Sequence, residues 1–307
     1  MKVVGRGVVL VTFGAMVLAV LPAFGGGGQH YPNGAEDIFS GMAPPPGWHL
    51  VNYVFYYDAD TLTTSGGDID IDLKAWADVL RIIYSSDKKI LGGNYLAHIF
   101  VPYLDADLDP FGYSENGFGD LIVDPFILAW HGPTYHATAG IDVFVPVGEY
   151  DENSPINLIG RNFWTFEPVF AVTGMYQTGW SWSVKLMYDV NTKNDEFFNP
   201  VTGMHSDLEP GDEFHLDYSL DFDASQLSET LKGFRLGAAG YYYKQLADDE
   251  LDGADIPDDR GEAFAVGPVF MYSPSQKVHL VAKALFEVDT ENRPEGNAYW
   301  FKIIYSF

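Results

Sequence analysis

Residues 297–307, NAYWFKIIYSF, close the chain with a strict alternation of side chains. Counted back in twos from Phe307, every position as far as Tyr299 carries a large apolar or aromatic side chain, whereas Lys302 and Ser306 lie between them. Successive side chains of a β-strand point to opposite faces. The stretch therefore predicts a strand with one face that is compatible with lipid and a second face that tolerates charge.

Eleven segments upstream share this period of two, which predicts an all-β chain with an even number of strands. The clearest is 213–223, where Phe214, Leu216 and Tyr218 alternate with acidic and polar residues. The twelve predicted strands are residues 48–58, 68–84, 93–103, 117–130, 135–145, 162–176, 180–191, 213–223, 234–245, 261–272, 277–287 and 297–307.

Connection lengths help to separate a membrane barrel from a secreted β-sandwich, since both would show alternation. The connections after odd-numbered strands average about 14 residues and the others about 6, as in outer-membrane barrels with both termini in the periplasm. The long set includes the acidic stretches Leu104–Asn116, Thr192–Asp212 and Leu246–Arg260. The pattern favours an antiparallel transmembrane β-barrel of about 12 strands, and a secreted sandwich remains the alternative.

The N-terminus predicts export and divides the chain into three parts. Lys2 and Arg6 precede an apolar run of about 14 residues, shorter than the roughly 20 that a membrane-spanning helix needs. We expect residues 1–25 to be a cleaved signal peptide, 26–47 a Pro/Gly-rich leader and 48–307 the barrel, located in the bacterial outer membrane. The leader is either a flexible periplasmic tail or a plug in the lumen.

Composition excludes several classes of function. The 307 residues contain no cysteine, so disulfides, thiol catalysis and zinc–thiolate sites are absent. A formal net charge of −26 argues against a nucleic-acid partner. Asp105, Asp107 and Asp109 alternate as in a calcium loop, but Pro110 stands where that loop needs Gly, so we expect a solvated acidic loop and no metal site there. We expect no cofactor elsewhere in the chain.

Several ordered segments resemble the outer-membrane transporters of the phenol meta-degradation family. They are HYPNGAED (30–37), PPPG (44–47), GD (119–120), WH (130–131), GID (140–142), NFWTFEP (162–168), KLMYDVN (185–191) and GYYY (240–243). These proteins are often encoded with pathways for aromatic compounds. The resemblance implies a barrel that passes hydrophobic or aromatic molecules across the outer membrane.

Two sets of residues have the parity that we assign to the lumen. The apolar set could form a path for an apolar solute, or pack to seal the bore. It comprises Trp76, Phe144, Met187, Tyr241, Tyr243 and Trp300. The charged set predicts a salt-bridge network that fills the bore. It comprises Asp120, Asp142, Lys185, Asp189, His215, Asp217, Arg235, Lys283, Glu287 and Lys302.

Three predicted strands carry a proline in mid-run, namely Pro125, Pro168 and Pro268. Because proline removes a ladder donor, each predicts a bulge or a local break. Such a break could serve barrel curvature alone. The functional hypothesis is a kink that opens a lateral exit from the lumen to the lipid.

The sequence thus predicts a non-enzymatic outer-membrane channel for passive uptake of small hydrophobic or aromatic compounds. A structural or general-diffusion barrel is the first alternative. A lipid-active enzyme is the second, although no nucleophile-elbow or zinc-protease motif accompanies His205–Ser206, His131 or His136. The expected partners are outer-membrane lipid and lipopolysaccharide, a small hydrophobic solute, and the barrel-assembly machinery through the strand that ends in Phe307.

Overall fold

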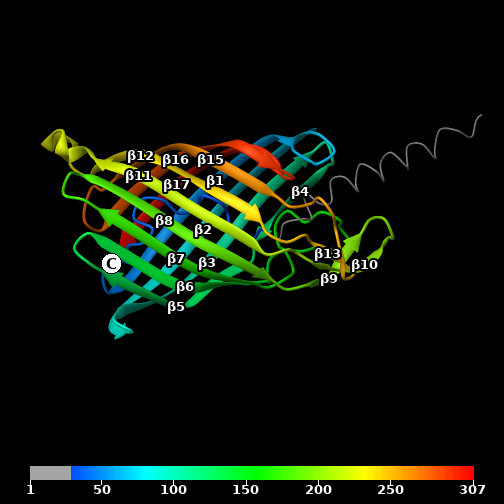
Figure 1. Ribbon diagram of the computed structural model, residues 1–307, viewed down its shortest axis with the longest axis horizontal. Coiled ribbons are helices and arrows are strands. Elements are labelled where there is room, and N and C mark those ends of the chain that lie inside the picture. Colours follow the sequence, from blue (N-terminus) through cyan, green and yellow to red (C-terminus); the bar gives the residue numbers. More distant parts are fainter. Residues whose placement is uncertain (1–28) are drawn as a thin grey trace, which may run out of the picture.

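Twelve antiparallel strands form a closed barrel in the computed structural model, which describes residues 29–307 (Figure 1). The last strand pairs with both its predecessor and the first strand, which closes the ring and leaves no free edge. The strands are β1 (Gly47–Leu62), β2 (Ile69–Ile90), β3 (Gly93–Asp109), β5 (Leu121–His131), β6 (Tyr135–Val145), β7 (Thr165–Met175), β8 (Trp180–Asn191), β11 (Glu213–Asp223), β12 (Phe234–Gln245), β15 (Glu262–Tyr272), β16 (Val278–Glu291) and β17 (Pro294–Ser306). The predicted barrel of about 12 strands is confirmed, and the predicted signal peptide lies outside the described residues.

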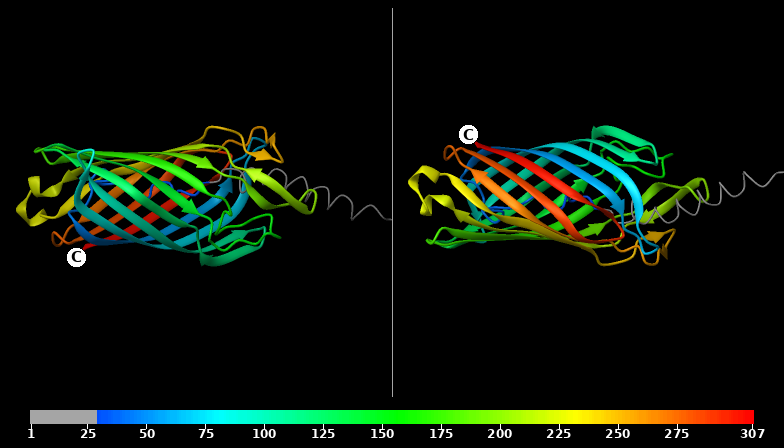
Figure 2. Two further views of the ribbon diagram at one scale, coloured as in Figure 1. Left: turned by 90° about the horizontal axis from the view of Figure 1, so that it is seen from below. Right: turned by 90° about the horizontal axis from the view of Figure 1, so that it is seen from above.

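The two ends of the barrel differ, as the connection lengths predicted (Figure 2). At one end, here called the loop end, the connections 146–164 and 192–212 are 19 and 21 residues long. At the other, the turn end, four of the five connections have only two to five residues, and the chain finishes beside Trp48. The loop end has one comparably short connection between barrel strands, 292–293. Only η1 (Ala224–Gln226) and η2 (Glu229–Leu231) extend a connection at the turn end.

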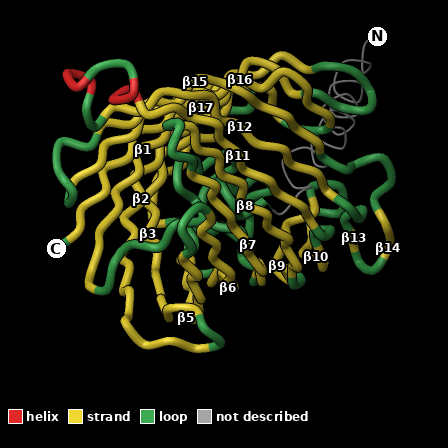
Figure 3. Tube along the Cα trace, turned by 60° about the vertical axis from the view of Figure 1, so that its left-hand side comes forward, coloured by secondary structure: helices red, strands yellow, loops and turns green. Residues whose placement is uncertain are grey.

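The loop end carries more strand than the sequence predicted. The acidic stretch Leu104–Asn116 is not a loop: β3 continues to Asp109 and turns into β4 (Tyr113–Phe118), which pairs with it. This hairpin helps to bury a small apolar cluster around Leu62 and Leu108, both fully buried, and the cluster favours strand over loop. A second, four-stranded sheet stands over this end, built from β9 (Asn194–Asn199), β10 (Met204–Glu209), β13 (Glu250–Leu251) and β14 (Ala254–Asp255) (Figure 3).

The outer face has the layered polarity of a bilayer-spanning barrel. An apolar belt that includes Leu80, Leu220 and Phe270 is exposed between two aromatic girdles. The exposed girdle residues are Trp76, Tyr103, Phe118, Trp164, Phe166, Tyr188, Phe264 and Tyr299 towards the loop end, and Trp48, Tyr84, Tyr135, Tyr176, Trp180, Tyr305 and Phe307 at the turn end. Among the described residues, no helix is long and apolar enough to span a membrane.

The leader lies inside the barrel. Gln29 and His30 lie at the loop end, beside Arg293 and Asp120. The chain then runs through the bore, reaches Thr173 and Ser183 at Gly41 and Phe39, and meets the start of β1 at the turn end, where Pro45 bonds to His49. The buried apolar core therefore forms between the leader and the inner faces of the strands.

Close strand contact at Gly267 provides a test of the barrel wall. A Cβ at this position would collide with the backbone carbonyl of Ala284 on β16. We expect Gly267→Ala to destabilise the folded barrel by about 1–3 kcal/mol, because backbone on both sides must move. Gly66→Ala is the control, since the nearest atom to its Cβ is 3.7 Å away. Urea unfolding in detergent measures both, and equal stability of the two variants would contradict this packing.

Candidate functional site

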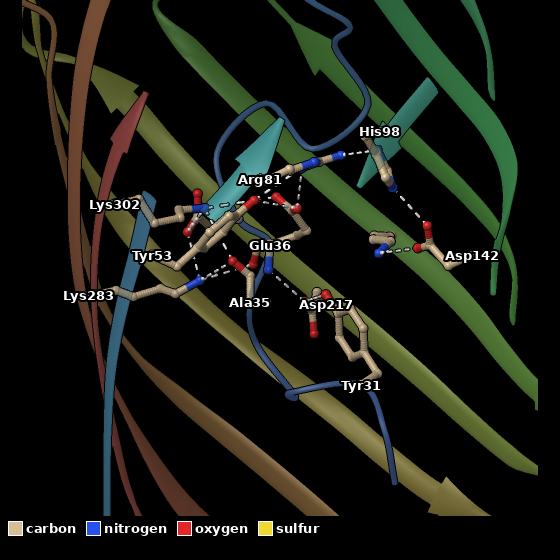
Figure 4. A network of polar contacts seen from close by, with 12 residues as sticks. Tyr31, Ala35, Glu36, Tyr53, Arg81, His98, Asp142, Asp217, Lys283 and Lys302 are labelled. Carbon is tan, nitrogen blue, oxygen red and sulfur yellow. Dashed lines mark hydrogen bonds and ion pairs between the residues drawn. The ribbon is translucent and has the colours of Figure 1, made fainter. Parts of the chain in front are cut away.

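Two buried lysines on neighbouring strands clamp one carboxylate of the leader. The Nζ atoms of Lys283 on β16 and Lys302 on β17 each lie 2.7 Å from Oδ2 of Asp37. Both lysines also donate to the carbonyl oxygen of Ala35 at 3.2 Å. All three charged side chains are at least 95 % buried, so the clamp replaces the hydration that each has lost. Figure 4 shows Lys283 and Lys302 side by side, both directed towards Ala35 of the leader.

Glu36, the residue before Asp37, links the leader to a second chain of charges. Its Oε1 accepts a hydrogen bond from Arg81 at 3.0 Å and from the hydroxyl of Tyr53 at 3.2 Å. Arg81 also donates a hydrogen bond to Nδ1 of His98 at 2.8 Å, and Nε2 of His98 is hydrogen-bonded to Asp142 at 2.8 Å. These contacts extend from the leader to β6 (Figure 4).

Asp217 on β11 binds the leader from another part of the barrel wall. Its carboxylate accepts from the Tyr31 hydroxyl at 2.6 Å and from the backbone N–H groups of Gly34 and Glu36, each at 2.9 Å. Gly34 has φ of 75°, and a Cβ there would meet Leu285 and Tyr241. A glycine therefore fits this bend both in conformation and in space.

Asp120, in the connection between β4 and β5, closes the loop end of the site. It contacts His30 at 3.0 Å and accepts backbone N–H groups of Gly148 and Arg161, each at 2.8 Å. Burial raises the pKa of Asp120, but the bonds from His30 and the two amides outweigh it, so the pKa lies below its usual value.

Cavities lie on both sides of these charges. The upper cavity, about 160 Å³, opens towards the loop end and has a mainly apolar lining that includes Phe55, Phe100 and Ile122. A side cavity of about 290 Å³ adjoins it and shares Tyr31 and Phe55 with it. The lower cavity, about 360 Å³, lies towards the turn end. The upper and lower cavities share four lining residues, Glu36, Tyr53, Asp142 and Lys185, so the charged constriction separates them.

Five of the six residues assigned to an apolar path do face inward. Phe144 and Trp300 line the upper cavity, and Tyr241 and Tyr243 line the side cavity. Met187 is 1 % exposed and belongs to the packed core.

The assignment of Trp76 to the lumen is wrong. Its side chain is 53 % exposed and packs on Tyr56 outside the barrel, with ring centroids 4.4 Å apart. The sequence assignment took the charged face of β2 to be the inner one. Asp70, Asp72 and Lys74 instead face outward near the loop end, and the inner face of β2 carries Ala77, Val79 and Arg81.

All ten residues of the charged set are on the lumen side, in several separate contacts. Besides the clamp, Lys185 lies 3.8 Å from Asp142 and Arg235 pairs with Asp221 near the turn end. Glu287 accepts from the Tyr57 hydroxyl at 2.7 Å and from Tyr241. The remaining two, Asp189 and His215, lie 3.3 Å apart.

The sequence assignment missed the acidic pair of the leader, Glu36 and Asp37, together with Arg81 and His98. The signal for the pair was available: two adjacent acids in a leader that precedes a barrel with unpaired inward lysines. Arg81 and His98 lie on the correct parity once the inner faces of β2 and β3 are known.

The three prolines lie where the ladder is interrupted. Pro125 occupies a stretch in which the pairing of β5 with β6 shifts register between Val123 and Leu128. Pro168 on β7 is paired in the ladder with β6, and Pro268 on β15 is paired in the ladder with β12. On the other side, two residues including the proline are unpaired in the ladder of β7 with β8 and in that of β15 with β16. The lateral exit at these kinks stays a hypothesis.

Comparison with known proteins supports the fold and places the chain in a family. Residues 58–303 match the model of a family described as "Putative MetA-pathway of phenol degradation". The chain is also similar to the crystal structure of an outer membrane channel from Pseudomonas putida F1, with a TM-score of 0.77 and 17 % identity, over 89 % of this chain and all of that one. No curated protein matches significantly.

More distant barrels align less well. The translocator domain of the autotransporter NalP from Neisseria meningitidis has a TM-score of 0.49 at 10 % identity, over 86 % of this chain and 90 % of that one. The KdgM porin has a TM-score of 0.44 at 10 % identity, over 84 % of this chain and 99 % of that one.

The lysine clamp predicts a large loss of stability when its carboxylate is removed. We expect Asp37→Asn to lower the free energy of unfolding by about 3–5 kcal/mol, because two buried ammonium groups lose their shared counter-charge. Asp289→Asn, an exposed position on the neighbouring β16, is the control. Urea unfolding in detergent measures the difference, and an effect of Asp37→Asn no larger than that of the control would show that the clamp is not needed.

Proposed function

Because the chain belongs to the family whose description is "Putative MetA-pathway of phenol degradation", we propose that it is an outer-membrane channel for passive uptake of small hydrophobic or aromatic compounds. The exposed apolar belt and its two girdles fit a barrel that sits in outer-membrane lipid and lipopolysaccharide. Downhill passage needs no cofactor. The final strand, with Phe307 at its end, is the segment that we assign to recognition by the assembly machinery.

The upper cavity carries this proposal. Its volume of about 160 Å³ and its lining of Phe55, Phe100 and Phe144 suit a single aromatic ring. Lys185, Tyr53 and Glu36 at its floor offer donors and acceptors to a polar substituent such as a phenol hydroxyl. We therefore infer that a small aromatic compound with one polar group enters the upper cavity and passes the constriction to the lower cavity when the leader shifts.

Uptake by cells tests the solute class. Cells that express the wild-type protein should take up radiolabelled phenol and toluene several-fold faster than cells without the gene, with no change for a polar sugar or a long-chain fatty acid. Phe144→Asn should remove most of this gain, because a polar amide weakens an apolar binding surface. Phe144→Leu, which keeps the surface apolar, is the matched control. Equal uptake with and without the gene would contradict a channel function.

A structural or general-diffusion barrel is the alternative, and the occupied bore favours its structural form. Glu36, Tyr53, Asp142 and Lys185 lie between the upper and lower cavities, so we infer that wild-type passage requires movement of the leader. An inert barrel would hold the leader permanently in place.

Conductance in planar lipid bilayers separates these alternatives. A channel should give brief, resolvable openings, and Glu36→Gln should lengthen them severalfold, because the leader loses the charge that pairs with Arg81 and Lys302. Glu229→Gln, exposed in η2, should behave as wild type. If neither the wild-type barrel nor the Glu36→Gln variant shows any conductance, the structural alternative is favoured.

The family and the barrel point to a transporter rather than an enzyme. The histidines considered for catalysis are consistent with this. His131 and His136 contact each other at 3.0 Å at the turn end, and the Ser206 hydroxyl accepts a hydrogen bond from Asn199 at the opposite end. We infer that neither group does covalent chemistry, and an absence of phospholipid hydrolysis by the purified protein is the expected result.

A further inference from the structure

Neighbouring strands place carboxylates directly beside one another on one side of the lumen. Asp142 on β6 is opposite Glu167 on β7, and Asp189 on β8 is opposite Glu213 on β11. The register of β7 and β8 also sets Glu167 against Asp189 across the interrupted ladder. Like charges in directly opposed positions destabilise a sheet. This carboxylate row, Asp142, Glu167, Asp189 and Glu213, therefore needs a compensating positive charge.

Three members of the row are completely buried and lack hydrogen-bond partners at key atoms. Glu167, Asp189 and Glu213 are 0 % exposed. Both carboxylate oxygens of Glu167, both of Asp189 and Oε2 of Glu213 have no hydrogen bond. Lys185 is 3.8 Å from Asp142, the fourth member of the row, and lies over the ring of Tyr31. Buried carboxylate oxygens without partners are costly, and a cation that binds several of them removes that cost.

His215 on β11 completes the group and is oriented as a metal ligand. Its Nδ1 lies 2.7 Å from Oδ1 of Asn33, and an amide oxygen only accepts, so Nδ1 carries the proton and donates. When a cation displaces the second ring proton, Nε2 offers a lone pair, and this atom has no hydrogen bond. A histidine that binds a metal through one ring nitrogen usually donates a hydrogen bond from the other, which fixes the orientation of the ring.

The distances within the group match a small cation. Nε2 of His215 lies 3.3 Å from Oδ2 of Asp189 and 3.5 Å from Oε2 of Glu213. Bonds of about 2.0–2.2 Å to a tetrahedral metal set neighbouring ligands about 3.3–3.6 Å apart. The three ligand atoms form one compact, fully buried group. The same separations are long for hydrogen bonds between a protonated ring and two carboxylates.

From these contacts we propose that Asp189, Glu213 and His215 form a structural site for a divalent first-row transition cation such as Zn²⁺. A nitrogen among carboxylates favours Zn²⁺ over Ca²⁺, which prefers oxygen alone. The cation neutralises the carboxylate row. It also fixes the ring that holds Asn33, and so ties the leader to the wall of the barrel.

A second buried group of similar composition, His98, Asp124 and Asp142, serves as the internal control. There Nδ1 of His98 accepts from Arg81 at 2.8 Å and Nε2 reaches Asp142 at 2.8 Å, so the ring has no free lone pair. Arg81 and Lys185 already supply positive charge. This group needs no metal, although it also consists of one histidine and two carboxylates.

Metal content of the folded protein tests the proposal. The full chain is folded into detergent micelles with Zn²⁺, dialysed against a weak chelator and measured by mass spectrometry for metal. We expect about one zinc per chain in the wild type and in His98→Gln, and less than a tenth of that in His215→Gln. Wild-type protein that folds but keeps no zinc overturns the proposal, as does full retention of zinc by His215→Gln.

Cobalt provides a readout that does not depend on any variant folding. Wild-type protein folded with Co²⁺ should show the intense visible absorption of a four-coordinate ion with nitrogen and oxygen ligands, displaced by one equivalent of Zn²⁺. The weak absorption of a six-coordinate ion would identify exposed acidic loops as the binding place and overturn the buried site. Neither measurement depends on solute uptake, so the site and the channel proposal can fail separately.

Discussion

The carboxylate of Asp37, shared by Lys283 and Lys302, is the contact on which the interior of this protein depends. A barrel in lipid must turn its charges inward, and a bore of this size cannot hydrate them fully. The leader solves this on one side by bringing Glu36 and Asp37 to the lysines and Arg81. On the other side it brings backbone N–H groups and the Tyr31 hydroxyl to Asp217. The same 18 residues, 29–46, thus compensate opposite charges on two walls.

The leader is therefore part of the buried core, and it also blocks the lumen through which a solute would pass. Its side chains and backbone line the upper, side and lower cavities, so any change in its position alters all three. The apolar surfaces for a solute are consequently divided by a charged constriction. A ring with one polar substituent meets both kinds of surface, whereas a sugar gains nothing from the aromatic lining and an alkane nothing from the charges.

The sequence predicted the barrel almost strand for strand, because alternation, connection length and the terminal aromatic pattern all report the same outer surface. It predicted less of the interior. The alternation of side chains along a strand assigns each residue to one of two faces but does not say which face is inside. The assignment of Trp76 to the lumen rested on Lys74 and Asp78, the charged residues on its own face of the strand. Beyond the aromatic girdle, outward-facing charges are in water. The charged face near the start of β2 is therefore the outer one, whereas the charged face of β11 is the inner one. Several contacts between the leader and the wall join residues more than 180 positions apart, such as Tyr31 and Asp217, and no local pattern encodes them.

Charge compensation in the lumen is uneven. The leader supplies acids to the basic wall but only neutral donors to the acidic wall, and those donors reach Asp217 without reaching Glu167 or Asp189. Met187, opposite His215 in the register, is packed and apolar, so the carboxylate row has no polar medium to screen it. Unscreened carboxylates on adjacent strands repel most strongly where the dielectric is lowest. A compact positive charge bound between them is the arrangement that keeps these strands together without adding another side chain to a full bore.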